Sequence, residues 1–297
     1  MDKILITGAS GFVAKNLKNY LSNTFDVVQY SVRFKPNQII EISENVIIHL
    51  AGKAHDLKKV SQPQEYYEAN FELTKQLFDS FLLSKASVFI FMSTVKAVAD
   101  EAEGIITEET NSSPKTHYGI SKLQAENYIL NQKIPDGKRV YILRPCMIHG
   151  QGNKGNLNLL YKIVSKNIPW PLGAFDNKRS FCSIDNLLFV IKELIEREDI
   201  PSGIYNIADD ESLSTNELIS LIAESQNRKP NVWKIPKGFI EGMAKLGDVL
   251  HLPLNTERLQ KLTDSYVVSN QKIKDAIGKT LPVSSRDGLL KTFKSFK

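Results

Sequence analysis

Tyr118 and Lys122 lie four residues apart where a helix is predicted to begin. If that helix runs over 118–131, the spacing puts the phenol and the ammonium on one helix face. A nearby cation favours the phenolate and lowers the pKa of a tyrosine from its usual value of about 10. The two residues therefore have the chemistry of an acid–base pair, although an ordinary helix surface can carry the same residue types.

A glycine-rich stretch at residues 8–14, GASGFVA, directly follows a predicted strand and opens a predicted helix. Such a turn lets the backbone approach a pyrophosphate, whose charge the helix N-terminus stabilises. Ala14, at the third glycine position, still permits close packing of helix on strand. We therefore expect a dinucleotide here. The expected cofactor contacts are Gly8, Ser10, Gly11, Phe12 and Val13.

The end of the second predicted strand bears on the choice of dinucleotide. An acidic residue about 20 residues after the turn would bind the ribose hydroxyls of NAD. Residues 28–33 contain no carboxylate, and Asp26 comes too early. Ser31 and Arg33 could instead receive a 2′-phosphate, unless Arg33 is merely a solvated loop residue. The sequence therefore favours NADP(H), with NAD(H) as the open alternative.

Composition and charge exclude several other classes of protein. The hydrophobic content of 42% is ordinary for a globular protein, and the net charge of +5 comes from scattered lysines and arginines rather than a nucleic-acid-binding run. Cys146 and Cys182 have no metal or redox spacing, which indicates a reducing compartment and no metal site. The apolar run at the N-terminus is too short and too soon interrupted by glycine for a signal peptide, and no apolar run is long enough to span a membrane, so we expect neither feature. We expect a cytoplasmic protein that binds neither nucleic acid nor a membrane.

Short β-rich runs alternate with helical patterns along the first half of the chain. This alternation predicts an α/β fold with a doubly wound parallel sheet, covered by helices on both faces. Strands are expected at 3–7, 26–31, 45–51, 88–94, 139–145 and 203–208. Helices are expected at 12–21, 64–84, 118–131, 184–197, 214–226 and 236–247.

The composition changes after Gly150, where residues 151–180 become rich in Gly, Asn and Pro, as in a long ligand-facing segment. We expect a nucleotide-binding domain at 1–150, which also receives about 180–208, and a smaller, interwoven substrate-binding lobe at 151–297.

Five motifs, TGASGFVA, IIHLAGKAH, FMSTVKA, YGISK and LRPCMIHG, occur in an order and spacing that resemble the extended short-chain dehydrogenase/reductase superfamily, with its Rossmann domain. More narrowly, the chain resembles the nucleotide-sugar epimerase/dehydratase/reductase branch. Residues 150–187 look like the substrate segment of UDP-N-acetylhexosamine enzymes that reduce or epimerise at C4 in bacterial polysaccharide pathways. The resemblance covers most of the chain, to about residue 285.

The resemblance implies a catalytic triad. Tyr118 would be the acid/base at the C4 oxygen of the sugar, and Lys122 would bind the nicotinamide ribose and lower the pKa of the tyrosine. Thr94 would donate a hydrogen bond to the same C4 oxygen, with Ser93 as an assistant. Asn70 matches an asparagine beside the nicotinamide, unless it is a helix-surface residue.

The resemblance also implies further binding residues. Lys53 and His55 could reach the sugar or a phosphate, or face solvent, and Arg179 and Arg258 would clamp the diphosphate unless they form surface salt bridges. Further cofactor contacts would be Leu50, Ala51, Gly52, Pro145 and Cys146. Further substrate contacts would be Met147, Asn156 and Leu157, with Trp170 lining a uracil pocket.

The chain departs from the family pattern at several places. Only residues 34–44 separate the second strand from IIHLAG, so the usual strand and adenine-binding aspartate are missing or rebuilt. His149 replaces a more usual tyrosine. Thr94 is followed by Val95-Lys96, whereas sugar-nucleotide 4,6-dehydratases have Asp-Glu there to eliminate water. Without these carboxylates the dehydratase reaction loses its acid–base pair.

The leading interpretation is therefore an NADP(H)-dependent 4-ketoreductase of a UDP-4-keto-6-deoxy-N-acetylhexosamine. The alternative is a UDP-hexose or UDP-N-acetylhexosamine 4-epimerase that keeps NAD tightly bound. A third class, a catalytically silent nucleotide-sensing or scaffold protein on the same fold, conflicts with the intact triad. The resemblance also implies a homodimer through the helices at 64–84 and 118–131.

Overall fold

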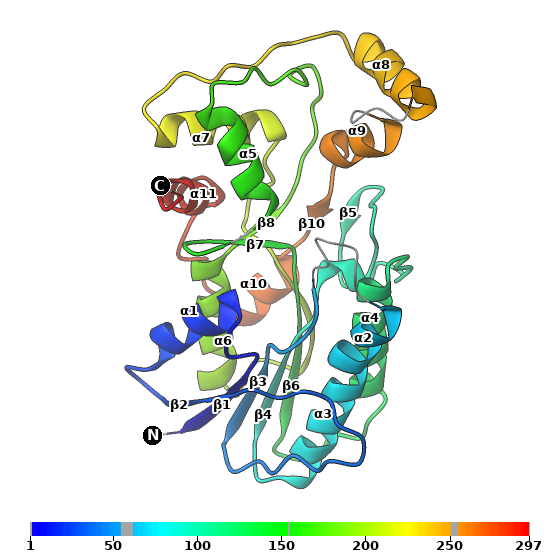
Figure 1. The fold of residues 1–297 in the computed structure, drawn as a ribbon. Helices are drawn as coiled ribbons and strands as arrows, with labels where there is room; N and C mark the ends of the chain where they lie inside the picture. The colour runs from blue at the N-terminus through cyan, green and yellow to red at the C-terminus, as the bar shows by residue number, and fades with distance from the viewer. Residues whose placement is uncertain (1, 55–61, 154, 251–254, 297) are drawn as a thin grey trace.

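A computed structural model describes residues 2–54, 62–153, 155–250 and 255–296 of the chain. Six parallel strands form the central sheet in the order β2-β1-β3-β4-β6-β9 (Figure 1). β3 and β4 lie in the middle and are buried at every residue, as expected of parallel strands covered on both faces. The strands are β1 (Lys3–Thr7), β2 (Asp26–Tyr30), β3 (Val46–His49), β4 (Val88–Met92), β6 (Arg139–Pro145) and β9 (Gly203–Ile207).

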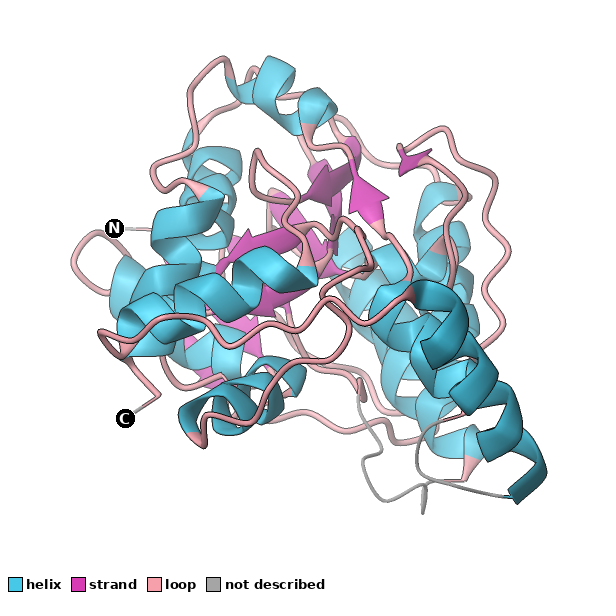
Figure 2. Ribbon diagram, turned by 90° about the horizontal axis from the view of Figure 1, so that it is seen from above, coloured by secondary structure: helices cyan, strands magenta, loops and turns pink. Residues whose placement is uncertain are grey.

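Helices cover both faces of this sheet (Figures 1 and 2). One apolar cluster joins alternate strand residues to the helices on one face, and a second cluster does the same on the other. The first face carries α1 (Phe12–Leu21), α6 (Ile184–Glu196) and α10 (Gln271–Ile277). The second carries α2 (Pro63–Tyr67), the π-helix η1 (Glu68–Glu72), α3 (Leu73–Leu83) and α4 (His117–Leu130). The predicted doubly wound α/β fold is confirmed.

The remaining elements form a lobe beyond the carboxyl ends of the strands (Figure 1). Two apolar clusters hold it together, one around Phe293 and one around Trp170. Its helices are α5 (Asn156–Ser165), α7 (Thr215–Ser225), α8 (Lys237–Leu250), α9 (Thr256–Thr263) and α11 (Ser285–Lys294). Short strands pair as β7 (Met147–His149) with β8 (Phe181–Ser183), and as β5 (Ile105–Ile106) with β10 (Val267–Val268). The 3₁₀ turn η2 (Val95–Ala97) follows β4.

Several details differ from what the sequence predicts. Residues 156–165 form a helix inside the stretch expected to be a long ligand-facing segment, because Leu157, Leu160, Tyr161 and Val164 follow helical spacing and pack together. Residues 31–45 contain neither strand nor helix, so no extra strand lies between β2 and β3. Within the described ranges, no helix is long and apolar enough to cross a bilayer.

Candidate active site

The glycine turn lies directly against the end of β3. Gly8 has φ +74°, and a Cβ there would lie 2.8 Å from the backbone nitrogen of Ala51 and 2.9 Å from the carbonyl carbon of Leu50. A side chain at Gly8 would therefore be strained and would also collide. The glycine brings together two of the sequence motifs predicted to bind the cofactor.

The first turn of α1 has the features of an anion-binding helix end. Gly11 is the N-cap and provides no side-chain hydrogen bond to the helix, whereas Thr116 caps α4 and Ser214 caps α7 through their hydroxyls. An uncapped N-terminus keeps its N–H groups and the positive end of its dipole free for an anion. The predicted contacts Ser10 and Gly11 are exposed beside it.

The end of β2 lies beside this turn, because the Gln29 side chain contacts the carbonyl oxygen of Ala9 at 3.5 Å. Ser31 and Arg33 follow the strand, and both are exposed. The structure therefore puts an exposed hydroxyl and an exposed guanidinium close to the glycine turn, and no carboxylate between residues 28 and 33.

The three residues of the predicted triad meet at the carboxyl end of β4. Thr94 forms a hydrogen bond with the Tyr118 hydroxyl. The Nζ of Lys122 donates to the carbonyl oxygen of Met92 at 2.8 Å, from below the same strand end. Gly119 makes this approach possible, because a Cβ there would collide with the carbonyl oxygen of Lys96 in η2.

Burial sets the protonation of this pair. Burial lowers the pKa of Lys122 to about 7, with the Glu126 carboxylate acting in the opposite direction. Burial also raises the pKa of Tyr118, and the hydrogen bond from Thr94 opposes this only in part. The expectation that Lys122 would lower the pKa of the tyrosine is therefore wrong for this structure. Desolvation outweighs the hydrogen bond from Thr94, and Tyr118 keeps its proton.

A buried ion pair that the sequence did not predict lies beneath the triad. Arg144 Nε donates to both Glu126 oxygens at 3.0 and 3.1 Å, and its Nη2 donates to Oε2 at 2.5 Å. Ser93 also donates to this carboxylate, and all three side chains are buried. The observed partner of the Ser93 hydroxyl is therefore the Glu126 carboxylate, whereas the resemblance implied that Ser93 would assist at the sugar. Glu126 follows Lys122 by four residues, a spacing that could have indicated the pair.

Asn70 lies in the π-helix η1 and is fully buried, so the alternative of a helix-surface asparagine is wrong. Its Oδ1 accepts from the backbone N–H of Lys53 at 2.7 Å, and its Nδ2 donates to the carbonyl of the same residue at 3.0 Å. The Nδ2 also contacts the hydroxyl of Ser121 at 3.0 Å. Single-turn π segments are frequent at functional sites. Here the asparagine fixes the chain that follows Gly52.

A directed chain of hydrogen bonds runs through His49, which the sequence did not single out. Thr74 donates to the carbonyl oxygen of Asn70 at 2.7 Å, so it accepts from His49 Nε2 at 3.0 Å. Thr7 accepts from the backbone N–H of Ala51 at 3.2 Å and donates to His49 Nδ1 at 2.7 Å. Burial lowers the pKa of His49 to about 3, so the ring is neutral with its proton on Nε2. The chain links the strand end beside Gly8 to Asn70.

Gly52 and Lys53 lie directly against the Asn70 side chain. A Cβ at Gly52 would lie 2.7 Å from Asn70 Oδ1 and 3.1 Å from Lys122 Nζ, so any larger residue would displace these two side chains. The Lys53 ammonium pairs with Glu65 of α2. His55, the other predicted sugar or phosphate contact, lies outside the described residues.

Three other predicted contacts have side chains that are buried in apolar clusters. Trp170 is 7% exposed and packs in the apolar cluster of the C-terminal lobe, and its place in a uracil pocket stays a prediction. The Cys146 side chain is buried in the sheet cluster, and burial raises the pKa of its thiol well above the usual value. Leu157 is buried beside α7, so only its backbone N–H in the first turn of α5 could contact an anion.

The remaining predicted contacts are spread over the chain: four of them lie on four different helices and strands, and Arg179 lies just before β8. Pro145 ends β6, Met147 opens β7 and Asn156 opens α5. Arg179 is half-buried and its Nε donates to the carbonyl of Asp264 at 3.1 Å, while burial lowers the pKa of its guanidinium. Arg258 is exposed on α9.

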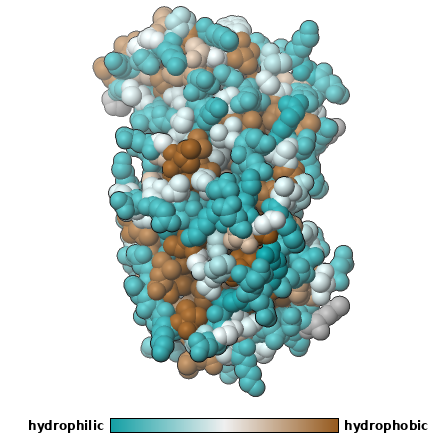
Figure 3. Space-filling model, turned by 180° about the vertical axis from the view of Figure 1, so that it is seen from behind, coloured by the Kyte–Doolittle hydropathy of each residue, from teal (hydrophilic) through white to brown (hydrophobic). Residues whose placement is uncertain are grey.

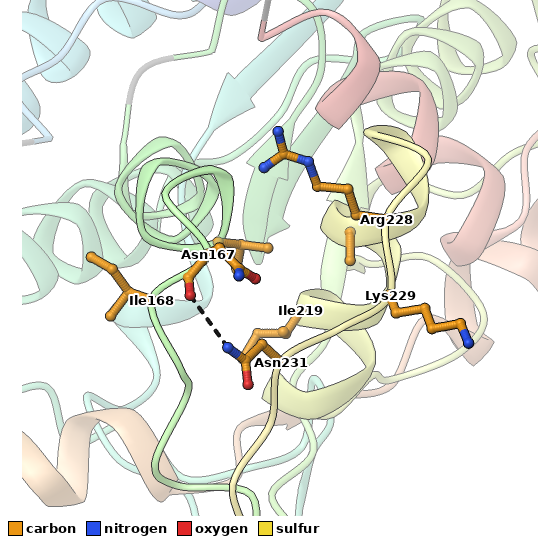
Figure 4. A pocket seen from close by; sticks show the side chains of 8 residues that line it. Asn167, Ile168, Ile219, Arg228, Lys229 and Asn231 are labelled. Carbon is orange, nitrogen blue, oxygen red and sulfur yellow. Dashed lines mark hydrogen bonds between the residues drawn. The ribbon is translucent and has the colours of Figure 1, made fainter.

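A hollow in the C-terminal lobe is separate from all of these residues (Figure 4). It lies beside α5 and α7, and none of the predicted cofactor or substrate residues lines it. Asn231 Nδ2 donates to the carbonyl of Asn167 across it at 3.3 Å. Its lining residues are Val164, Asn167, Ile168, Ile219, Ala223, Arg228, Lys229 and Asn231.

The chemistry of the site fits a dinucleotide without a metal. The glycine turn and the uncapped α1 can hold a pyrophosphate, and Lys122 with Tyr118 can bind ribose hydroxyls. Among the described residues, no cluster of His, Cys, Asp and Glu could hold a metal ion.

Comparisons with known proteins agree with this geometry. Residues 4–208 match the model of the "NAD dependent epimerase/dehydratase family". UDP-glucose 4-epimerase of Vibrio cholerae is 28% identical over 99% of this chain and 95% of its own. UDP-2-acetamido-2,6-beta-L-arabino-hexul-4-ose reductase of Pseudomonas aeruginosa is 24% identical over 77% of this chain and 59% of its own.

Two further proteins are similar over much of the chain. N-acetyl-alpha-D-glucosaminyl-diphospho-ditrans,octacis-undecaprenol 4-epimerase of Escherichia coli O157:H7 is 27% identical over 77% of this chain and 73% of its own. The solved structure of UDP-N-acetylglucosamine 4-epimerase from Bacillus cereus shares the fold with a TM-score of 0.74 at 19% identity, covering 100% of this chain and 98% of that one. The protein therefore belongs to the NAD dependent epimerase/dehydratase family and is an enzyme of the nucleotide-sugar branch of the extended short-chain dehydrogenases/reductases.

Proposed function

We propose that the protein is an NADP(H)-dependent 4-ketoreductase of a UDP-4-keto-6-deoxy-N-acetylhexosamine that supplies a bacterial surface polysaccharide. The observation that supports it most directly is that Thr94, Tyr118 and Lys122 meet at the carboxyl end of β4, in a chain whose β2 end lacks the carboxylate that NAD would need. Tyr118 holds its proton at neutral pH, as a general acid must before it donates to the ketone oxygen.

The roles of the chain's own residues follow from their contacts. A bound nicotinamide supplies the hydride that reaches C4 of the ketosugar. Tyr118 donates its proton to the oxygen that becomes negative, and Thr94 stabilises that oxygen with a preorganised hydrogen bond. Lys122, whose pKa burial lowers to about 7, would bind the ribose hydroxyls of the nicotinamide nucleotide. Burial of these groups strengthens each interaction, because the local dielectric is low.

NADP(H) is favoured over NAD(H) by the charge at the end of β2. A 2′-phosphate needs a cation or several hydrogen-bond donors, and Arg33 with Ser31 offers both. A free 2′-hydroxyl would be better served by a carboxylate, which residues 28–33 lack. Solved relatives of the fold hold either coenzyme, for example RMD from Pseudomonas aeruginosa complexed with NADPH (20% identical, TM-score 0.70, covering 100% of this chain and 99% of that one).

A UDP-sugar suits the cations of the C-terminal lobe. Arg179 has a partly desolvated guanidinium, which binds a diphosphate more strongly than a fully hydrated one. Arg258 and the first turn of α5 at Asn156 are the other proposed contacts. Closure of the lobe on the substrate would have to bring these residues together, since they lie on separate elements.

A UDP-hexose or UDP-N-acetylhexosamine 4-epimerase with tightly bound NAD is the second candidate. The names of two relatives, UDP-glucose 4-epimerase of Vibrio cholerae and the undecaprenol-linked 4-epimerase of Escherichia coli O157:H7, favour it. An epimerase should purify with NAD that survives dialysis and turn over without added coenzyme.

The decisive experiment mixes the dialysed protein with NADPH and enzymatically generated UDP-4-keto-6-deoxy-N-acetylglucosamine. Stoichiometric loss of the NADPH absorbance is the expected result. No loss, with substrate and coenzyme intact, would reject the reductase and direct the test to conversion of UDP-N-acetylglucosamine. Tyr118→Phe should lose about 10²-fold or more in rate while its affinity for NADPH, measured by fluorescence, stays unchanged. Full activity of this variant would refute the acid role.

Three further assignments accompany this proposal. Residues 1–150, with 180–208, would form the coenzyme-binding domain and 151–297 the substrate lobe. The two buried free cysteines suit a cytoplasmic protein. A homodimer would form through the helices at 64–84 and 118–131, which lie side by side on one face of the sheet. A strictly monomeric mass in solution would contradict the dimer.

A further inference from the structure

α8 turns only part of its apolar surface toward the protein. Ile240, Ala244 and Gly247 are buried against the cluster that contains Trp170 and Leu259. These three residues form a narrow stripe with i, i+4 and i+7 spacing.

A second apolar stripe runs beside the first and faces outward. Phe239, Met243, Leu246 and Leu250 follow one another at i, i+4, i+7 and i+11, so they lie on one line along the helix. Their exposed fractions are 62%, 47%, 54% and 57%. Large apolar side chains that are exposed as a continuous line mark an interaction site more often than scattered ones do.

The segment that leads into α8 is cationic and aromatic. Residues 225–240 contain no carboxylate, and Trp233 in this segment is 55% exposed. Glu241 and Asp248 lie with Lys245 on the polar side of α8, away from the exposed apolar stripe, and Asp248 accepts a hydrogen bond from Thr256. The cations of the segment are Arg228, Lys229, Lys234 and Lys237.

These features share one end of the molecule. Residues 226–236 run from α7 to α8 along the edge of the C-terminal lobe farthest from the sheet (Figure 1), and hydrophobic residues are visible at this end from behind (Figure 3). Arg228 and Lys229 also line the hollow of Figure 4, where the Arg228 guanidinium donates to the carbonyl of Ser165 at 3.0 Å. Lys237 lies with Glu241 on the polar side of α8, and its ammonium is 5.6 Å from the centre of the Phe175 ring. We call the exposed apolar stripe, Trp233, Arg228, Lys229 and Lys234 the α8 surface.

We propose that the α8 surface docks peripherally on an anionic phospholipid bilayer. A helix with an exposed apolar stripe lies in the plane of the interface, with its apolar side chains at the boundary of the acyl chains. The indole of Trp233 has an apolar body and a polar N–H, which suits the headgroup region of a bilayer. The apolar stems of lysine and arginine can pack on acyl chains while their charged ends reach the lipid phosphates. Anionic lipids attract nearby cations.

Charge favours a bilayer over a second copy of the chain. Two α8 surfaces docked face to face would bring Arg228, Lys229 and Lys234 of both copies into one interface, and like charges within an interface weaken association. This proposal differs from the expectation that a membrane is no partner, which rested on the lack of a spanning segment. Peripheral docking needs no spanning segment. It is also independent of the reaction at Tyr118.

The test is flotation of the full chain with vesicles of mixed phosphatidylglycerol and phosphatidylcholine. We expect binding at low salt, weaker binding as salt is added, and little binding to pure phosphatidylcholine. Lys229→Gln combined with Lys234→Gln should weaken binding by about 25-fold, since each cation near an anionic surface contributes about fivefold. Phe239→Ser combined with Leu246→Ser should weaken it at every salt concentration.

Matched variants and a folding measurement keep the result interpretable. Ile39→Ser removes an exposed apolar side chain elsewhere, and Lys85→Gln combined with Lys133→Gln removes two exposed lysines at the other end of the sheet. Both controls should bind vesicles as the unchanged protein does. Thermal unfolding should show that every variant is folded.

Three results would overturn the proposal. The first is absence of binding to phosphatidylglycerol vesicles at low salt by folded protein, and the second is equal loss in the control variants. The third is a variant in α8 that changes the oligomeric mass and leaves vesicle binding unchanged, because the surface would then bind a second copy of the chain.

Discussion

Replacing Lys122 with methionine should make the coenzyme-free protein more stable at neutral pH. The pKa of Lys122 falls from 10.5 to about 7 on folding because the ammonium is buried. The unfolded chain therefore binds more protons than the folded protein between these values, so this lysine lowers the free energy of unfolding below pH 10.5. A difference of about 3.5 in pKa corresponds to a cost of roughly 5 kcal/mol at and below pH 7.

Methionine keeps much of the volume of lysine and removes the charge. It also removes the hydrogen bond of 2.8 Å to the carbonyl of Met92, and an unpaired buried carbonyl costs about 1–3 kcal/mol. The net gain for Lys122→Met at pH 7 is therefore roughly 2–4 kcal/mol, or about 4–8 °C in Tm for a chain of this size. Above pH 10.5 the cost of burial disappears, and the variant should become less stable than the unchanged protein.

The assay is thermal unfolding of dialysed protein at pH 7 and at about pH 10.5, the pKa of the lysine in the unfolded chain. Lys85→Met, which removes an exposed ammonium, should change Tm little at either pH. Added NADPH should raise the Tm of the unchanged protein and do so much less for Lys122→Met, because ligand binding stabilises the folded state. A Lys122→Met protein that is less stable at pH 7, or equally stabilised at both pH values, would refute the reasoning.

Three further predictions concern the residues around the triad. Glu126→Gln leaves the Arg144 guanidinium buried without a charge partner, so denaturant titration should show a loss of about 3–5 kcal/mol; an unchanged midpoint would contradict the buried pair. Gly8→Ala should weaken dinucleotide binding and cost about 1–3 kcal/mol or more in stability. Gly137→Ala, at a similar positive φ but with open space around it, isolates the strain and should leave binding intact; equal loss of binding in both would reject the close approach. The His49 ring, with a pKa of about 3, should show no titration by NMR between pH 5 and 8, and a midpoint in that range would disprove the directed hydrogen-bond chain.

Local pattern was enough to predict the strands and helices of the sheet domain. Apolar runs such as residues 88–92 and the glycine turn of Gly8 are short-range signals, and the structure places them as expected. The helix at 156–165 was hidden by the glycines and asparagines around it, although its apolar spacing was present. Among predicted site residues, Thr94 and Tyr118 come together at one strand end.

The sequence by itself determined the order of the motifs, and therefore the family, the parallel sheet and the residues that meet at its carboxyl edge. Only the tertiary structure decided their protonation. The spacing of Tyr118 and Lys122 predicts a lowered pKa for the tyrosine, whereas burial raises it. Desolvation depends on every atom packed around a group, and the Glu126–Arg144 pair joins residues from a helix and a strand. Spacing along the chain encodes which side chains can be neighbours, and packing alone sets how much water remains beside them.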